Sequence, residues 1–142
     1  MVKTNEYLSQ FMGTGYPNYI FYKLEYILWK NREDICRIYN LDLDKWNKFR
    51  LTAKNSVEHI FPQNPDPKWK IELGNDEYNY IKENYLNTIG NLTLSGNNGK
   101  LGNKYFTEKQ VMNDENKEQG YKFSRLWLNR DLQTLSKWNR IE

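Results

Sequence analysis

Apolar residues recur at the spacing of one helical face along the first third of the chain. Between Tyr19 and about Asn40 this spacing predicts one helix or a pair of helices. Within Leu41–Lys54 apolar side chains repeat at intervals of three, which predicts a second, shorter helix over the same core. The apolar positions that define these predicted faces are Ile20, Leu24, Ile27, Leu28, Ile35, Ile38, Leu43, Trp46 and Phe49.

The pattern changes at Ser56. Residues 57–61 are a short run of β-favouring side chains that stops at Pro62, which predicts a strand ending in a loop. Gln63–Gly74 contains prolines and has little periodicity, so we expect a loop there. Helical spacing returns over Asp76–Leu86. An excursion with one helix therefore separates the first strand from the next.

A second strand is predicted at Asn91–Leu94, followed by a tight loop, because residues 95–99 are dense in turn-forming side chains. Tyr105–Met112 can form a helix. A last helix, running to about Trp138, is predicted from the spacing of Leu128, Leu132 and Leu135.

Composition places the chain among folded domains. Its 142 residues fit one domain with a moderate core, and 15% of them are aromatic. The mean hydropathy of −0.96 indicates a polar surface. The chain has no apolar run of about 18 residues, and residues 1–6 lack the apolar core of a signal peptide, so we expect a cytoplasmic protein without a membrane partner. The net charge of +3 permits a polyanionic partner but does not demand one.

Cysteine and histidine usage limits the chemistry. Cys36 is the only cysteine and His59 the only histidine, which excludes an intramolecular disulfide and a zinc site built from Cys and His. Any metal must bind oxygen atoms and at most one imidazole. Histidine is the side chain that ordinarily titrates near neutrality, so His59 can accept a proton from water at physiological pH. A lone histidine on a strand is nevertheless more often an ordinary, partly buried residue.

Several short motifs follow one another in a fixed order. They are E-H-I-x-P-Q at 58–63, G-N-L-T-L at 90–94, the loop residue Asn98, a second asparagine at Asn103, and F-x-x-K from Phe106 to Lys109. In this ordered set the chain resembles the C-terminal nuclease domain of GmrSD-type, modification-dependent restriction enzymes. Residues 126–132 also resemble that family's closing helix, so the resemblance covers at least residues 56–138.

The resemblance implies membership of the HNH (His-Me finger) superfamily, whose ββα-metal finger holds one divalent cation against the scissile phosphate. We therefore expect an α+β fold in which flanking helices surround this finger. One HNH-like nuclease domain would span residues 1–142, with a helical N-terminal part (1–55), the finger with an insertion (56–112) and a closing helix (113–142). The expected activity is an HNH-type endonuclease that hydrolyses DNA phosphodiester bonds with Mg²⁺ or Mn²⁺ and serves in defence against foreign or modified DNA.

Phosphodiester hydrolysis needs a base that deprotonates water, a cation that neutralises developing charge, and an in-line attack. By the resemblance, His59 is the general base. Asn91 fits the middle asparagine of the HNH name, whose side-chain amide binds the loop backbone and holds the base strand in place. Lys109, on the helix of the finger, completes the predicted catalytic set as a point charge near phosphate.

Two residues are candidate metal ligands. Glu58 occupies the position where many HNH domains have a metal-binding Asp, and carboxylates suit Mg²⁺. Neighbouring residues on a regular strand point to opposite faces, so Glu58 could equally be a structural carboxylate. Asn98 occupies the position of the superfamily's Asn or His ligand. Spacing alone does not exclude Asn97, although the interval of five to Asn103 favours Asn98.

A positive patch is predicted beside the site. It consists of Lys100, Lys104 and Lys109 with Asn103, all within the loop and helix that the ββα arrangement places against the DNA backbone. The same side chains could equally form a solvated helix surface.

An alternative function is a catalytically inactive, nuclease-like module that binds nucleic acid or a protein. Such a module would keep fold residues such as Phe106 while losing a catalytic group. His59, Pro62 and Asn98 are all retained, so the sequence favours activity. The family's usual domain for nucleotide-dependent control is absent from this chain. Either a separate domain or subunit supplies that control, or it has been lost. Nothing in the sequence indicates an oligomeric state.

Overall fold

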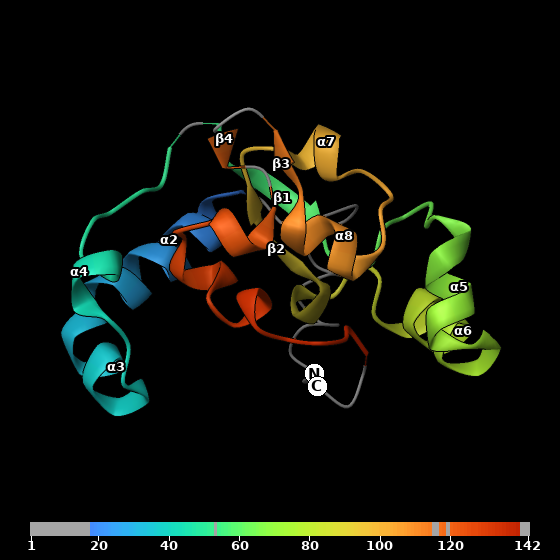
Figure 1. Ribbon diagram of the computed structural model, residues 1–142, viewed down its shortest axis with the longest axis horizontal. Helices are drawn as coiled ribbons and strands as arrows, with labels where there is room; N and C mark the ends of the chain where they lie inside the picture. Colours follow the sequence, from blue (N-terminus) through green and yellow to red (C-terminus); the bar gives the residue numbers. More distant parts are fainter. Residues whose placement is uncertain (1–17, 53, 115–116, 119, 140–142) are drawn as a thin grey trace.

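Two short strands form the central sheet of the protein, whose structure is a computed structural model describing residues 18–52, 54–114, 117–118 and 120–139. Strand β1 (Ser56–His59) pairs antiparallel with β2 (Leu92–Ser95), with Ser56 opposite Ser95 and His59 opposite Leu92. Both strands lie where the sequence predicts them. The fold is a mixed helical domain, mostly α with minor β, and helices flank the sheet on both sides (Figure 1).

The predicted N-terminal helical pair is confirmed. It consists of α2 (Asn18–Lys30) and α3 (Arg32–Tyr39), and α3 ends at Asn40, whose φ of 53° is left-handed. The predicted buried face is confirmed only in part: Ile20, Leu28 and Ile35 are half-buried and pack against the core, whereas Leu24 is exposed and Ile27 and Ile38 are 55% and 69% exposed. The fully buried residues of the pair are Phe21, Glu25 and Cys36.

A buried carboxylate on α2 explains why the face that bears Glu25 lies inward. Glu25 accepts hydrogen bonds from the backbone N–H groups of Trp127 (2.5 Å) and Leu128 (2.9 Å), and its backbone partners satisfy a group that would be costly to bury alone. The next helix, α4, is shorter than predicted and covers only Leu43–Trp46. Phe49 lies beyond it, 42% exposed, with its ring against those of Tyr26 and Trp29.

The excursion between the strands contains two helices, α5 (Pro67–Leu73) and α6 (Asn75–Asn84), where the sequence predicts one. Proline starts α5 instead of preventing it, because a first-turn proline lacks only a backbone N–H that the helix does not need. The Asp66 side chain caps the same turn by accepting from the Lys68 backbone N–H at 2.9 Å. Gly74, with φ of 82°, separates the two helices.

After β2 the chain forms α7 (Asn98–Leu101) and α8 (Phe106–Val111), followed by a small antiparallel pair, β3 (Asn113–Asp114) and β4 (Lys117–Glu118). The predicted helix over Tyr105–Met112 is therefore confirmed. Single 3₁₀ turns complete the fold: η1 (Ile89–Asn91) before β2, then η2 (Tyr121–Phe123), η3 (Trp127–Asn129) and η4 (Asp131–Gln133).

The predicted closing helix is absent from the described part of residues 113–139, where η3 and η4 take its place. Its backbone forms the short-range hydrogen bonds of single 3₁₀ turns, such as Asn129 N–H to the Leu126 carbonyl, and other backbone groups bind side chains from other elements. Gln110 donates to the carbonyls of Leu132 (2.8 Å) and Leu135 (2.7 Å), and Glu25 accepts from the N–H groups in η3. These tertiary hydrogen bonds replace the repeating pattern that an α-helix requires.

The core surrounds the end of β1. Ile60 and Phe61 follow the strand directly and are almost completely buried, so the residue before them, His59, is anchored by the largest cluster of the protein. That cluster also contains Trp69, Ile81, Leu101, Tyr105, Phe106, Tyr121 and Leu132. Among the described helices, none is long and apolar enough to cross a membrane.

Candidate active site at the end of strand β1

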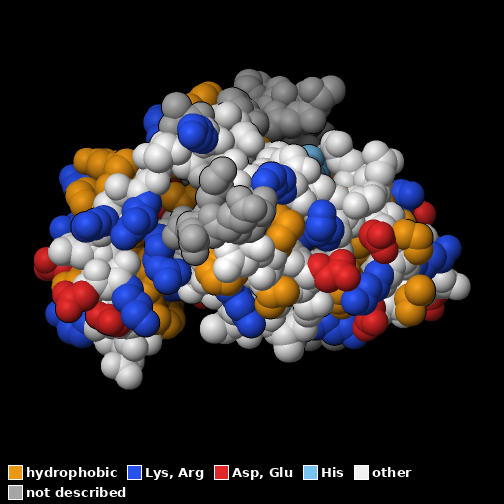
Figure 2. All heavy atoms as spheres, turned by 45° about the horizontal axis from the view of Figure 1, so that its top comes forward, with side chains coloured by type: hydrophobic (Ala, Val, Ile, Leu, Met, Phe, Trp, Pro, Cys, Tyr) orange, Lys and Arg blue, Asp and Glu red, His pale blue; other side chains and the backbone are white. Residues whose placement is uncertain are grey.

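His59 ends β1 half-buried, and the imidazole of this single histidine reaches the surface (pale blue in Figure 2). Its Nε2 lies 2.9 Å from Oδ1 of Asn87, an exposed residue between α6 and η1. An amide oxygen can only accept a hydrogen bond, so this contact suits the tautomer that carries its proton on Nε2. The lone pair of the neutral ring then lies on Nδ1, which can accept a proton from water.

Asn91 holds the segment that follows His59. Its side chain is fully buried, and its Nδ2 donates to the carbonyls of Phe61 and Leu86, both at 2.9 Å. Its Oδ1 accepts from the Phe61 backbone N–H (2.7 Å) and from the indole N–H of Trp138 (3.2 Å). One amide thus satisfies four partners and fixes the loop after β1 against η1.

Asn98 begins α7 and is tied back to β1. Its Nδ2 donates to the carbonyl of Val57 at 2.8 Å. Val57 and His59 are two residues apart on one strand, so their side chains share a face. With its nitrogen engaged by the strand, the side-chain oxygen of Asn98 is the atom available to a cation.

Glu58 points to the opposite face, into the interior. Its carboxylate is 1% exposed and accepts from Nζ of Lys109, with Oε1 at 3.2 Å and Oε2 at 3.5 Å, and from the hydroxyl of Tyr121. Lys109 itself is fully buried and also donates to the carbonyls of His59 (2.8 Å) and Ile60 (3.1 Å). The Glu58 carboxylate is thus turned into the interior, where it pairs with Lys109, and the Lys109 ammonium is buried with it instead of lying on the exposed surface.

Burial dominates the ionisation of this trio. It raises the pKa of Glu58, although the Lys109 charge and the Tyr121 hydrogen bond partly offset the effect. Burial also lowers the pKa of Lys109, against the opposing pull of Glu58, and raises the pKa of Tyr121 well above its ordinary value. Hydrogen bonds hold the Glu58–Lys109 pair in place. The ammonium donates to four oxygen atoms, two of which are backbone carbonyls, and these two bonds fix the path of the strand at His59.

The remaining residues of the predicted positive patch lie on the surface. Lys100, Asn103 and Lys104 are exposed, and the ammonium of Lys104 donates to the carbonyl of Lys100 at 2.8 Å. In the space-filling view, Lys and Arg side chains form a broken band across the left and centre of the face, while Asp and Glu gather near its left edge and on its right half (Figure 2). Two of the three predicted lysines are therefore accessible to a polyanion.

The donor set suits a hard cation. The described residues contain no group of three or more His, Cys, Asp or Glu side chains that could hold a metal ion. The side-chain oxygen of Asn98 and one imidazole are instead donors of the kind that suit Mg²⁺, which binds few protein ligands and keeps several of its waters. Such a cation fits the oxygen atom that Asn98 presents next to β1.

Two contributors to the site were not predicted. Asn87 contacts the base, but in the sequence it is one of many asparagines and belongs to no motif. Tyr121 binds Glu58 from 63 residues further along the chain. For Tyr121, the alternation of β1 is the only sequence feature that indicates a partner. A carboxylate next to His59 must point inward, so it needs a buried partner.

The chain matches the family model for the C-terminal domain of GmrSD restriction endonucleases over residues 1–142. It is thus a domain of restriction endonucleases, a class that cuts DNA. The chain belongs to the GmrSD restriction endonuclease C-terminal domain family, as its motifs predicted. No curated protein and no solved structure matches it.

Proposed function

We propose that this domain is a metal-dependent endonuclease that hydrolyses DNA phosphodiester bonds, with β1, β2 and α7 forming a ββα-metal finger of the HNH (His-Me) type. One observation carries the proposal: His59 and the residue that binds Asn98 lie on the same strand. His59 ends β1 and contacts Asn87 through Nε2, and Asn98 binds the carbonyl of Val57 two residues earlier. Family membership supplies the reaction class, since restriction endonucleases cleave DNA.

The residues of the chain then have distinct tasks. His59 accepts the proton of the attacking water through Nδ1, and Asn87 holds the ring so that this nitrogen faces the substrate. Asn91 and the buried Lys109 are positioning residues, because both bind backbone groups next to His59. In-line attack requires the base to be placed within fractions of an ångström, which explains why so many buried contacts converge on one short segment.

Asn98 would hold the cation through its side-chain oxygen, with waters filling the other positions. Bound Mg²⁺ or Mn²⁺ would neutralise the charge that develops on the phosphate and the leaving oxygen. Lys100 and Lys104, with Asn103, would contact the DNA backbone as exposed groups, which favours binding without favouring any sequence.

The biological setting that the family suggests is restriction of foreign or modified DNA in the cytoplasm. A nucleotide-dependent regulatory domain or subunit is the partner we propose for this domain, because the resemblance to the GmrSD family implies such control.

A plasmid nicking assay tests the proposal. The protein is incubated with supercoiled DNA and Mg²⁺, Mn²⁺ or a chelator, and His59→Ala is compared with Asn79→Ala, which removes an exposed side chain of α6. Wild type and Asn79→Ala should nick DNA only with metal, and His59→Ala should be slower by about 10² to 10⁴. Asn87→Ala should lose a smaller part of the rate.

Wild-type rates in a folded His59→Ala protein would refute the assignment of the base. A wild-type protein that binds DNA and never cuts it, with either metal, would favour the inactive nuclease-like module over the enzyme.

A further inference from the structure

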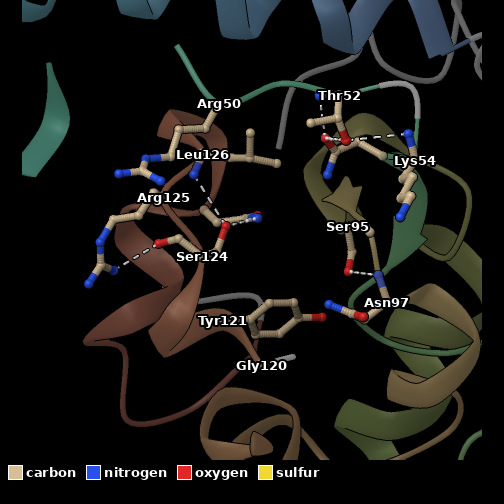
Figure 3. A pocket seen from close by; sticks show the side chains of 13 residues that line it. Arg50, Thr52, Lys54, Ser95, Asn97, Gly120, Tyr121, Ser124, Arg125 and Leu126 are labelled. Carbon is tan, nitrogen blue, oxygen red and sulfur yellow. Dashed lines mark hydrogen bonds between the residues drawn. The ribbon is translucent and has the colours of Figure 1, made fainter. Parts of the chain in front are cut away.

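A polar pocket of about 240 Å³ lies beside the Ser95 end of the β1–β2 pair (Figure 3). Three stretches of chain line it: residues 50–55 before β1, residues 95–97 after β2, and residues 120–129 around η2 and η3. Neither His59 nor Asn98 lines this pocket, so it is a separate feature of the surface.

The lining is cationic. Arg50, Lys54 and Arg125 contribute positive charge, and no Asp or Glu is among the described residues that line the pocket. Arg50 and Arg125 lie on one side, and Lys54 lies on the other with Asn97 (Figure 3). Neutral side chains that can donate hydrogen bonds also line the pocket, Ser124 beside Arg125 and Thr52, Ser95 and Asn97 on the Lys54 side (Figure 3), together with Asn55.

Hydrogen bonds fix both walls before any ligand binds. In the first wall, the Asn55 side-chain oxygen accepts a hydrogen bond from the Thr52 backbone N–H at 2.8 Å, which links the residues on either side of Lys54. In the opposite wall, Arg125 donates to the carbonyl of Ser124 at 3.1 Å. A pocket whose polar groups are already ordered loses less entropy when an anion binds.

The floor is equally fixed. Asn129 is buried and donates to the hydroxyl of Ser124 and to the carbonyl of Leu94, both at 2.9 Å. The carbonyl bond ties the pocket to β2, while the N–H of Asn97 donates to the Ser95 hydroxyl at 2.9 Å and shapes the turn that leads into α7.

The position of the pocket relates it to the candidate active site. Ser56 and Ser95, at the pocket end of the sheet, are opposite each other, and three residue steps of about 3.3 Å each lead from Ser56 to His59. The pocket end of β1 therefore lies roughly 10 Å from the base along the strand. Asn97 lines the pocket, and Asn98, which follows it directly, binds the carbonyl of Val57 between Ser56 and His59.

We infer that this pocket binds a phosphate of the DNA backbone, displaced from the scissile phosphate. The inference rests on the proposed function and assigns Arg50, Lys54 and Arg125 to DNA binding. The pocket has cations on two sides, and hydroxyl and amide donors line both sides as well. This set of groups suits a phosphodiester, whose charge is shared between two oxygens. A free nucleotide is a poorer occupant, because Tyr121, the only aromatic residue among the described residues of the lining, is 1% exposed and offers no face for a base.

Binding measurements test the inference without requiring cleavage. In a His59→Ala background with chelator, the affinity for fluorescein-labelled duplexes of two unrelated sequences is measured over a range of salt concentrations. Neutralising the pocket with Arg50→Gln, Lys54→Gln and Arg125→Gln should weaken binding to both duplexes alike. The slope of log affinity against log salt should fall by roughly 0.9 for each phosphate that the protein no longer neutralises. The matched control removes the same charge from helices α2, α5 and α6: Lys30→Gln, Lys70→Gln and Lys82→Gln.

Unchanged affinity and slope in the pocket variant, or an equally large decrease in the control, would overturn the assignment. A free-nucleotide site would also overturn it: calorimetry would then show a nucleoside triphosphate binding wild type but not the pocket variant, with DNA affinity unchanged. Lys54→Gln alone, at an exposed position, should lower the slope by the amount expected for one phosphate, and it covers the case in which the triple variant fails to fold. Cleavage is measured separately, so a protein that binds DNA through this pocket and never cuts would refute only the proposed function.

Discussion

Replacing Lys109 with methionine should destabilise the protein strongly while leaving the shape of its core almost unchanged. Methionine matches the apolar stem of lysine, so little cavity forms, and the group removed is the ammonium alone. That ammonium contacts both carboxylate oxygens of Glu58 and two backbone carbonyls in a site with no exposure to solvent. Its removal leaves a buried carboxylate without its counterion.

Breaking a buried ion pair by removing one partner costs about 3 to 5 kcal/mol, a large share of the roughly 5 to 15 kcal/mol that stabilises a typical domain. Glu58→Gln combined with Lys109→Met should recover much of this loss, because the neutral amide can still accept the hydrogen bond of Tyr121. With a urea dependence of about 1.5 kcal/mol per molar, the single variant should unfold at roughly 2 to 3 M lower urea.

The destabilisation should also depend on pH. Burial already raises the pKa of Glu58, and without the Lys109 charge, which lowers it, that pKa rises further. A carboxyl whose native pKa exceeds its unfolded value, about 4.3, stabilises the fold below that value and loses this contribution as pH rises through the native pKa. Lys109→Met should therefore lose most stability at pH 8 and less at pH 5.

Urea unfolding followed by tryptophan fluorescence, at both pH values, gives these quantities for wild type, the two single variants and the double variant. If the free energy of unfolding of Lys109→Met lies within about 1 kcal/mol of wild type, well below the cost of a broken buried pair, the pair does not hold the strand. A double variant less stable than Lys109→Met would refute the reasoning from the unpaired charge.

Three further variants and one control address other parts of the structure. Asn91→Ala should lower the free energy of unfolding by about 2 to 4 kcal/mol, because it leaves several buried backbone groups unpaired; a decrease below about 1 kcal/mol in urea unfolding would contradict this. Gly120→Ala would drive a Cβ into the backbone carbonyls of Lys109 and Gln110, so its urea midpoint should fall by the equivalent of about 1 to 3 kcal/mol, whereas Gly99→Ala, in open space, should match wild type. Asn98→Ala should weaken Mn²⁺ binding in calorimetry, and undiminished binding would move the ligand elsewhere.

Local patterning predicts only part of this fold. Both strands were predictable because β-favouring runs end at Pro62 and at a cluster of turn formers. The helix α5 was missed because its proline is a breaker inside a helix but a favourable residue at the start of one, and only the cap at Asp66 distinguishes the two cases. The closing segment was mispredicted because its leucines have helical spacing while its backbone binds side chains from α2 and α8.

The candidate site shows the same division. Motif order indicated His59, Asn91 and Asn98, and the alternation of β1 left the role of Glu58 open. The buried partner of this carboxylate, Lys109, is 51 residues away, and the resemblance had placed it near phosphate on the surface. Pairing between distant ionisable groups has no periodicity that a single sequence reveals.

The hydrogen bonds between Glu25 and the η3 backbone have a consequence for the order in which the protein matures during translation. They join residues 102 and 103 positions apart, and Trp138 reaches Asn91 from 47 positions further along the chain. A nascent chain acquires His59 and Asn98 well before the ribosome has released the segment that holds α2 and the loop after β1 in place. Since a domain of this size gains its stability as one cooperative unit, the cutting centre would be assembled only after nearly the whole domain has been synthesised. Chains interrupted before Leu126 would carry His59 and Asn98, the proposed base and metal ligand, without the backbone groups that Glu25 binds.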